Sequence, residues 1–336
     1  MAYKIAAFDK GQSFTSCSNL KGICALFCVM MLSSFSYAST SFTCAGSVIR
    51  VLDSNEAARK NSLGDEYTHE LTPFDLSIRL NKESELNESD YLDASAHNVR
   101  NWPLEEQNLL KQAFAEIETV ARTQALHLHL PDTLDLIKST CMEEFGAEGY
   151  TRKTRIILNT VAEPISTHLV AHELWHVISR YNIALRNKVY SGFGFKPCNR
   201  IDYKSAMHNR VITNPDCPFL EHYANVLYNG KELEMTLVLY SKITYQSGRS
   251  LFDYIHTSLL EVEGDAEHKH PVVNKGEPRT YELDDVPDFM KQIGTNTPYM
   301  LHIEEVAAEH FAALMAGKVF RQMSYVDKFK ICLQAN

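Results

Sequence analysis

A His-Glu-x-x-His pattern at residues 172–176 carries the clearest chemistry in the sequence. A helix turns once in about 3.6 residues, so His172 and His176 lie on one face of a helix, where two imidazoles can bind one zinc ion. Glu173 lies beside that face and can take a proton from water without being a ligand itself. The spacing therefore predicts a Zn²⁺ site with His172 and His176 as ligands and Glu173 as the general base.

The residues around this pattern predict a buried helix. Pro164 and the pair Ser166-Thr167 form a suitable start for it. Apolar side chains occupy nearly every face of the helix: Leu169, Val170, Ala171, Leu174, Trp175, Val177 and Ile178. A chain with 14 histidines can contain the five-residue pattern by chance, and the buried helix is the context that favours a true metal site.

A zinc site of the catalytic type needs a third protein ligand and keeps its fourth position for water. Glu221 and Glu305 are the two downstream candidates. Asn229-Gly230 lies between two apolar runs and predicts a β-hairpin. A strand over residues 222–228 leaves Glu221 without a helix to carry it, so we predict that Glu305 is the third ligand.

Residues 303–316 predict a helix with acidic residues in its first turn and Gly317 as its stop. Glu305 and Glu309 are four residues apart and share one face of this helix. Glu305 can bind the zinc ion, while Glu309 accepts a hydrogen bond from a ligand imidazole, as the outer partners of such histidines do.

The pattern at 172–176, followed by Glu305 and Glu309 on a second helix, resembles the gluzincin class of zinc metallopeptidases. The resemblance implies His172, His176 and Glu305 as ligands, Glu173 as general base, and a protein or peptide substrate. Glu309 stands where many members have Asp, and the interval from 176 to 305 is not typical of the best-known families. The stretch from about 100 to 317 is also similar to a group of uncharacterised bacterial secreted proteins.

The expected fold class is α+β, a zincin-like fold with a mixed sheet packed on the helix of the histidines. A helix over 103–126 and strands over 134–138 and 154–160 precede that helix. Residues 156–160 are candidates for a sheet edge that pairs with an extended substrate, and an ordinary core strand is the alternative. The two other predicted elements are a strand over 74–80 and a loop over 81–93.

The first 38 residues predict a secretory signal peptide. Lysines precede an apolar run over 23–32, and Ser36-Tyr37-Ala38 offers small residues for cleavage. We expect a secreted or periplasmic protein without a membrane span, since the run is too short to cross about 30 Å of hydrocarbon. With 42 acidic and 33 basic residues, the chain has no charge pattern for nucleic acid.

Residues 39–336 are expected to form a single domain with an inserted β-rich region at about 190–295 that covers the cleft. Five cysteines follow the signal peptide: Cys44, Cys141, Cys198, Cys217 and Cys332. In an oxidising compartment we expect Cys198 and Cys217 to form a disulfide, because they bracket a loop-like stretch.

Four other side chains bear on the predicted site. His168, one turn before His172, is expected to be hydrogen-bonded or exposed and not a ligand. A peptidase needs a donor for the oxyanion on the attacked carbonyl, and His208, His222 and Tyr299 are the candidates.

Two other functions fit the same pattern. One is a secreted binding module that zinc only stabilises, and the other is a zinc amidase that acts on cell-wall material. Glu173 disfavours the binding module, because a structural zinc site has no need of a base and fills all four positions with protein ligands.

Overall fold

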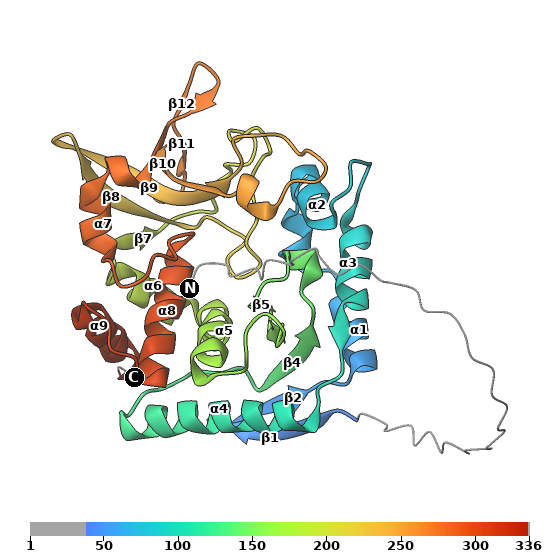
Figure 1. Cartoon of the computed structure of the whole chain (residues 1–336). Coiled ribbons are helices and arrows are strands. Elements are labelled where there is room, and N and C mark those ends of the chain that lie inside the picture. The colour runs from blue at the N-terminus through green and yellow to red at the C-terminus, as the bar shows by residue number, and fades with distance from the viewer. Residues whose placement is uncertain (1–37, 335–336) are drawn as a thin grey trace, which may run out of the picture.

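The computed structural model describes residues 38–334. Within this range the chain is a mixture of helices and sheets (Figure 1), as predicted. Residues 1–37, nearly the whole of the predicted signal peptide, lie outside the described part. Among the described helices, none is both long and apolar enough to cross a membrane.

The first sheet lies beside the helix of the histidines. Its strands, in spatial order, are β1 (Thr40–Cys44), β2 (Ser47–Val51), β4 (Thr133–Ser139), β6 (Arg155–Leu158) and β5 (Gly149–Arg152), with β3 (Val99–Arg100) paired to β4. Strands β2, β4 and β6 are parallel, whereas β5 runs antiparallel to β6. The predicted strands at 134–138 and 154–160 are therefore confirmed.

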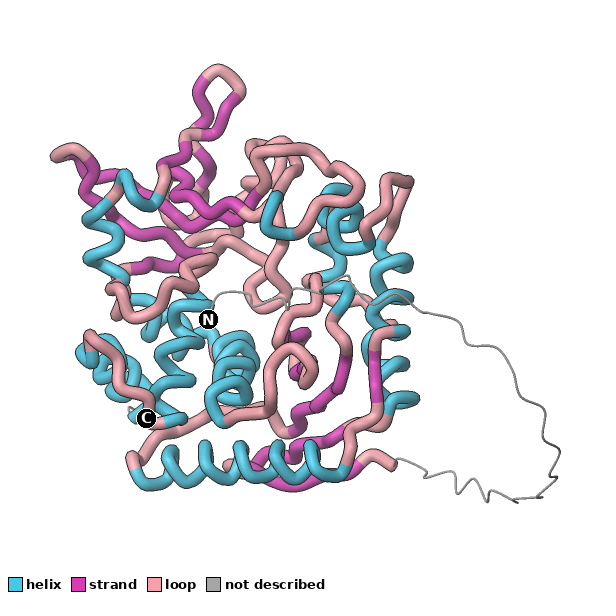
Figure 2. Tube along the Cα trace, viewed as in Figure 1, coloured by secondary structure: helices cyan, strands magenta, loops and turns pink. Residues whose placement is uncertain are grey.

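The prediction that residues 156–160 form a sheet edge is wrong. Strand β6 lies between β4 and β5, because the chain reverses at Lys153, whose φ is +55°, and pairs β5 along the outer side of β6. The edge strand next to the helix of the histidines is β5, and Figure 2 shows it beside that helix.

The helices of the first part of the chain are α1 (Ser54–Asn61), α2 (Pro73–Leu80), α3 (Glu88–His97) and α4 (Leu104–Thr123). Helix α4 confirms the predicted helix over 103–126. The predicted strand at 74–80 is wrong, because Thr72 and Asp75 form a capping box that begins α2. The predicted loop at 81–93 ends early, because Asn87 and Asp90 form a second capping box that begins α3.

The central helices are α5 (Thr167–Tyr181) and α8 (Ile303–Ala316), and α6 (Ile183–Ser191) and α9 (Met323–Gln334) pack beside them. Helix α7 (Pro287–Ile293) packs against β8 of the second sheet. Ser166 caps α5 through a hydrogen bond from the backbone N–H of Leu169, as its sequence predicts. Trp175 on α5 is buried against Phe311 of α8 and Phe329 of α9, at ring distances of 5.7 and 4.6 Å. Both central helices are thus fixed by a shared apolar core.

A second sheet lies on the other side of α8 from α4 (Figure 1). It contains β7 (Phe195–Pro197), β8 (His222–Tyr228), β9 (Lys231–Tyr240), β10 (His256–Glu263), β11 (His270–Pro271) and β14 (Thr280–Tyr281), and a small hairpin of β12 (Val273–Asn274) and β13 (Glu277–Pro278) extends from it. The predicted hairpin is confirmed: Asn229 and Gly230, with φ of +50° and +77°, join β8 to β9. Short 3₁₀ turns are η1 (Thr68–Glu70), η2 (Met142–Glu144), η3 (Leu251–Asp253) and η4 (Leu283–Asp285).

The predicted disulfide between Cys198 and Cys217 is wrong, and all five described cysteines are free thiols. The two side chains lie in different surroundings. Cys198 packs against the apolar cluster of the second sheet, near Lys269, whereas Cys217 faces the buried carboxylates of α8.

Candidate metal centre

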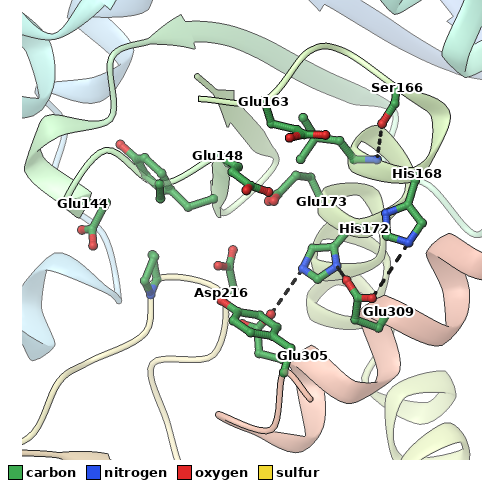
Figure 3. Close-up of a pocket in the computed structure, with 16 residues that line it drawn as sticks. Glu144, Glu148, Glu163, Ser166, His168, His172, Glu173, Asp216, Glu305 and Glu309 are labelled. Carbon is green, nitrogen blue, oxygen red and sulfur yellow. Dashed lines mark hydrogen bonds and ion pairs between the residues drawn. The ribbon is translucent and has the colours of Figure 1, made fainter. Parts of the chain in front are cut away.

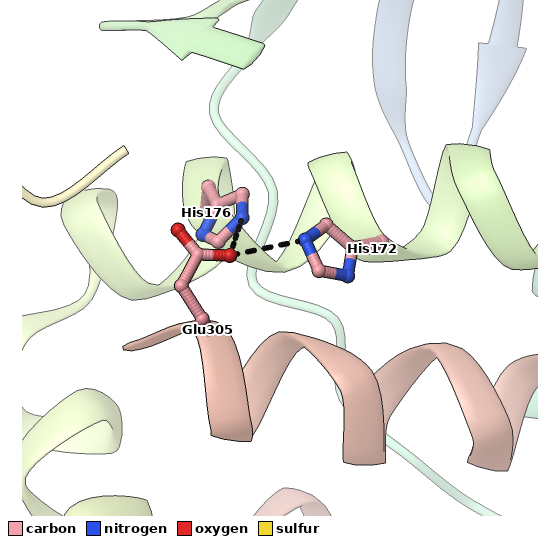
Figure 4. Close-up of side chains that lie close together, drawn as sticks. All are labelled: His172, His176 and Glu305. Carbon is pink, nitrogen blue, oxygen red and sulfur yellow. Dashed lines mark hydrogen bonds and ion pairs between the residues drawn. The ribbon is translucent and has the colours of Figure 1, made fainter. Parts of the chain in front are cut away.

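Helices α5 and α8 bring the three predicted ligands together (Figure 4). The Nε2 atoms of His172 and His176 lie 3.3 and 3.7 Å from the same atom, Oε2 of Glu305. One ligand atom from each of the three residues lies within 4.8 Å of the others. The i, i+4 spacing on α5 and the first turn of α8 produce this arrangement, because the two helices pack side by side.

These residues fit a zinc ion. Two imidazole nitrogens and one carboxylate oxygen are a donor set of catalytic zinc sites, which keep a fourth position open. Nε2 of His176 is buried and has no hydrogen-bond partner among the described residues. A buried polar atom without a partner is costly, and a metal ion at this position would satisfy it.

The second nitrogen of each histidine faces a carboxylate. Nδ1 of His172 lies 3.1 Å from Oε1 of Glu309, where the sequence predicts an outer partner. Nδ1 of His176 lies 2.9 Å from Oε1 of Glu304, which also accepts a hydrogen bond from Ser179, while Oε2 of Glu304 accepts one from Tyr190. Both Nδ1 atoms then carry the proton, which leaves both Nε2 lone pairs for a metal.

Glu304 is a functional candidate that the sequence analysis missed. It directly precedes the predicted ligand, and the sequence pattern identifies it only as an acidic residue suited to the first turn of a helix. The signal that could have found it is the apolar character of α8 on every side, since a carboxylate in such a helix is buried and needs a partner.

Glu173 is buried, with 3% of its surface exposed, and its Oε2 has no hydrogen-bond partner among the described residues. It packs against Gly149 of β5, where an added Cβ would lie 2.7 Å from Oε1 of Glu173. Burial and the carboxylate of Asp216 raise the pKa of Glu173 above its ordinary value, and His172 and His176 oppose them. The side chain is therefore a carboxyl group suited to exchanging a proton near neutral pH.

The electrostatics of the ligands favour a bound cation. Burial alone would raise the pKa of Glu309, but the hydrogen bond and charge of His172 outweigh it and lower this pKa to about 2. His176 behaves in the opposite sense: burial lowers its pKa, but Asp216, Glu305 and Glu304 outweigh burial and raise it to about 9. Without a metal the cluster binds protons, and a divalent cation would displace them.

A loop at residues 213–217 reaches the site from the connection between β7 and β8 of the second sheet. Asn214 Nδ2 donates to Oε1 of Glu305 at 2.6 Å, which orients that carboxylate. Asp216 lies within 4.8 Å of ligand atoms of Glu173 and His176. The sequence singles out neither Asn214 nor Asp216, because their contacts with Glu305 and β5 are long-range and leave no local pattern.

The site opens into a cleft of about 730 Å³, which includes its open mouth (Figure 3). Figure 3 shows His172, Glu173, Asp216 and Glu305 directed toward this space. Most of the polar lining is acidic: Glu144, Glu148, Glu163, Glu173, Asp216, Glu305 and Glu309. Gly149 and Tyr150 of β5 form one wall.

The other sequence candidates lie as follows. Tyr299 lines the cleft, with its ring centre 6.3 Å from that of His172. His208 is paired with Glu277 at 3.0 Å, and His222 lies 2.8 Å from Asn187, so neither is part of the cleft lining. His168 lies 3.9 Å from Glu309 and is not in the group of possible ligands.

Glu221, the rejected candidate for the third ligand, is engaged elsewhere. Its Oε2 accepts a hydrogen bond from Arg186 at 3.0 Å. It belongs neither to the group of His172, His176 and Glu305 nor to the second possible metal-binding group, Glu173, His176 and Asp216. The position of Glu221 immediately before β8 keeps it away from the α5 face that carries the histidines.

Comparison of the chain with protein family models, with curated proteins and with solved structures returned no match. The function proposed below therefore rests on the geometry of the site.

Proposed function

We propose that this chain is a secreted or periplasmic zinc metallopeptidase that hydrolyses peptide bonds, and that its fold is zincin-like. The single observation that carries the proposal is the convergence of His172, His176 and Glu305 on one point, beside a buried Glu173 whose Oε2 has no hydrogen-bond partner in the described part of the chain. A zinc ion bound there supplies Lewis-acid chemistry, which acidifies water and polarises a carbonyl group.

Glu173 acts as the base and then as the acid. Its Oε2 takes a proton from the attacking water and passes that proton to the nitrogen of the departing amine. The contact with Gly149 holds the carboxyl group in place, since a larger residue at that position would push it aside. Glu304 and Glu309 hold the two imidazoles in their orientation.

The placement of β5 supports a peptide substrate. This strand is an antiparallel edge next to α5, and its wall at Gly149 and Tyr150 lines the cleft. An extended peptide can add to such an edge through main-chain hydrogen bonds. We propose a zincin-like fold on the same basis, because an edge strand, a helix with two histidines and a second helix with a glutamate lie next to one another.

The test compares the protein with its Glu173→Gln variant, using an unfolded protein and cell-wall fragments as parallel substrates. We expect the native chain to cut the unfolded protein, and the variant to bind zinc equally while losing at least about 100-fold in rate. Undiminished hydrolysis by the variant would overturn the role of Glu173. Cleavage of wall fragments alone would assign an amidase instead.

A further inference from the structure

The outward edge of β5 is blocked at one end by Asp216. Its Oδ1 accepts hydrogen bonds from the backbone N–H of Thr151 at 2.7 Å and from the Thr151 hydroxyl at 2.9 Å. Because alternate residues of a strand point the same way, Gly149 is the next residue with its N–H and C=O on this edge. A substrate strand can therefore pair at Gly149, but it cannot continue past Thr151.

The Asp216 carboxylate at this end forms no direct ion pair within the described part of the chain, and His176 is the nearby group whose charge acts on it most. Among the described residues, no ion pair includes Asp216, and Arg180 instead donates to its backbone carbonyl at 3.0 Å. Glu148 and Glu163, which also line the cleft, have no ion pair within the described part of the chain either. Three carboxylates of the lining, those of Asp216, Glu148 and Glu163, thus have no ion-paired cation among the described residues.

A second observation shows that this space is built for a ligand. Glu173 is 3% exposed, has no partner for Oε2 within the described chain, and points into the same space as Asp216 (Figure 3). Ligand atoms of Asp216 and Glu173 lie within 4.8 Å of each other. A group that contacts Asp216 is therefore very close to the bond that Glu173 would act on.

We infer that Asp216 binds the α-ammonium group of the substrate, so that the enzyme removes residues from free N-termini. The inference rests on the proposed function. One end of the substrate must lie at Thr151, because its strand cannot continue past that residue. Whichever way the substrate runs, the Asp216 carboxylate attracts an α-ammonium group and repels a C-terminal carboxylate. The α-nitrogen is about 2.5 Å from the first carbonyl carbon, which suits the short span from Asp216 to Glu173.

The reaction is hydrolysis of the first peptide bond. One water is consumed, its oxygen bonds to the first carbonyl carbon, and the C–N bond breaks. One proton of the water goes to the nitrogen of the shortened peptide through Glu173, and the other is released by the new carboxyl group and protonates the resulting amine. The products are a free amino acid and a peptide with a new α-ammonium group, which is a substrate for the next cycle.

The first test uses the mature protein and a leucine-initiated hexapeptide, with its N-terminus free or acetylated, and mass spectrometry of the products. We expect single residues to be removed from the free peptide at least about tenfold faster than the acetylated one is cut. Internal cleavage of both at equal rates would overturn the inference and leave the proposed function standing. Cleavage of neither peptide, nor of the unfolded protein, would overturn both.

A positive charge at Asp216 could come from the α-ammonium group or from a side chain of the substrate. A third peptide, acetylated and with lysine as its first residue, separates these two sources. Cleavage next to that lysine at the rate of the free peptide would assign the site to a side-chain cation and overturn the α-ammonium assignment. Binding to the Glu173→Gln variant gives a readout without turnover. There the free leucine peptide should bind at least about tenfold more tightly than its acetylated form.

The variant Asp216→Asn keeps an oxygen that can accept the Thr151 hydrogen bonds and removes the charge. We expect its KM for the free peptide to rise about tenfold or more with a smaller change in kcat, and its preference for free N-termini to disappear. Its zinc content should stay unchanged. Asp284→Asn, an exposed site in η4, is the matched control. A preference that persists in Asp216→Asn would contradict the inference.

Discussion

The two helices that carry the proposed ligands and the loop that borders the cleft are held in place by different means. Helices α5 and α8 pack through a continuous apolar core that includes Trp175 and Phe311. The loop at 213–217 is held instead by polar contacts. Thr213 bonds to the buried Asp75 of α2 through its N–H at 2.9 Å and its hydroxyl at 2.8 Å, and Arg180 of α5 donates to the carbonyl oxygens of Pro215 and Asp216.

This difference assigns the proposed metal binding and proton transfer to the helices, and the recognition of substrate to the loop. The helices provide the proposed donors and the proposed base, and their packing fixes the distances within the candidate metal site. The loop contributes Asn214, which orients Glu305, and Asp216, which lies at the end of β5. Changes in the helices should therefore remove metal or turnover, whereas changes around the loop should alter stability and the recognition of substrate.

The largest effect is expected from Glu305→Ala, which removes a proposed ligand. Zinc affinity should fall by well over about 100-fold, since outer partners alone contribute about 10- to 100-fold. Glu221→Ala, which removes the other downstream candidate, should leave zinc affinity unchanged. Titration with a competing chelator measures both. Equal losses in the two variants would remove the basis for choosing Glu305.

The next effect concerns the anchor of the loop. Arg79 of α2 pairs with Asp75 at 2.7 Å and Glu144 at 3.2 Å, and it donates to the carbonyl of Thr213 at 2.5 Å. Arg79→Ala would leave two buried carboxylates unpaired and should lower the free energy of unfolding by about 3–5 kcal/mol. Urea unfolding measures this loss.

The exposed Arg249, 3.8 Å from Asp253, is the control for that experiment. Arg249→Ala should change the free energy of unfolding by about 1 kcal/mol or less, because exposed ion pairs contribute little. If Arg79→Ala were equally mild, the loop would not depend on the α2 anchor, and the contrast between the two regions would fail.

A smaller effect distinguishes the two outer carboxylates. Glu304→Ala and Glu309→Ala should each weaken zinc binding about 10- to 100-fold, because each removes the acceptor for one imidazole N–H. Glu304 also accepts from Ser179 and Tyr190, so its loss should in addition lower stability. A Glu304→Ala variant with native zinc affinity would show that His176 needs no such partner.

The effect that is smallest near neutral pH lies at His222, the first residue of β8. Burial, with a contribution from Arg186, lowers the pKa of His222 to about 3, against 6.5 in the unfolded chain. The stability from neutral His222 is complete above pH 6.5 and is lost as pH falls toward 3, at no more than about 1.4 kcal/mol per pH unit. His222→Gln should flatten this part of the stability profile. Substitution of the exposed His270 by Gln should leave the profile unchanged. If the free energy of unfolding depended on pH equally in both variants, the assignment of this dependence to His222 would be contradicted.

The same contrast between helices and loop explains what the sequence could predict. The helices α4, α5 and α8 and the hairpin at Asn229-Gly230 follow from local periodicity and turn chemistry, and all are present. Helix α2 was mistaken for a strand because Asp75 and Arg79, normally exposed types, are buried on one face and disguise the helical pattern.

Residues that depend on distant contacts were the ones missed. The edge position of β5 depends on a two-residue reversal at Lys153 and Thr154, which carries no strong turn signal. Asn214 and Asp216 meet Glu305 and Thr151 across 91 and 65 residues of sequence. No periodicity connects such pairs, so only the folded arrangement shows that they border one cleft.

The most direct test of the central claim is the metal content of the purified protein, measured by elemental analysis after zinc loading and removal of excess metal. We predict about one zinc per chain, and loss of that zinc in His176→Ala. An unaltered protein that holds no zinc after loading, while folded, would contradict the claim that α5 and α8 form a metal centre.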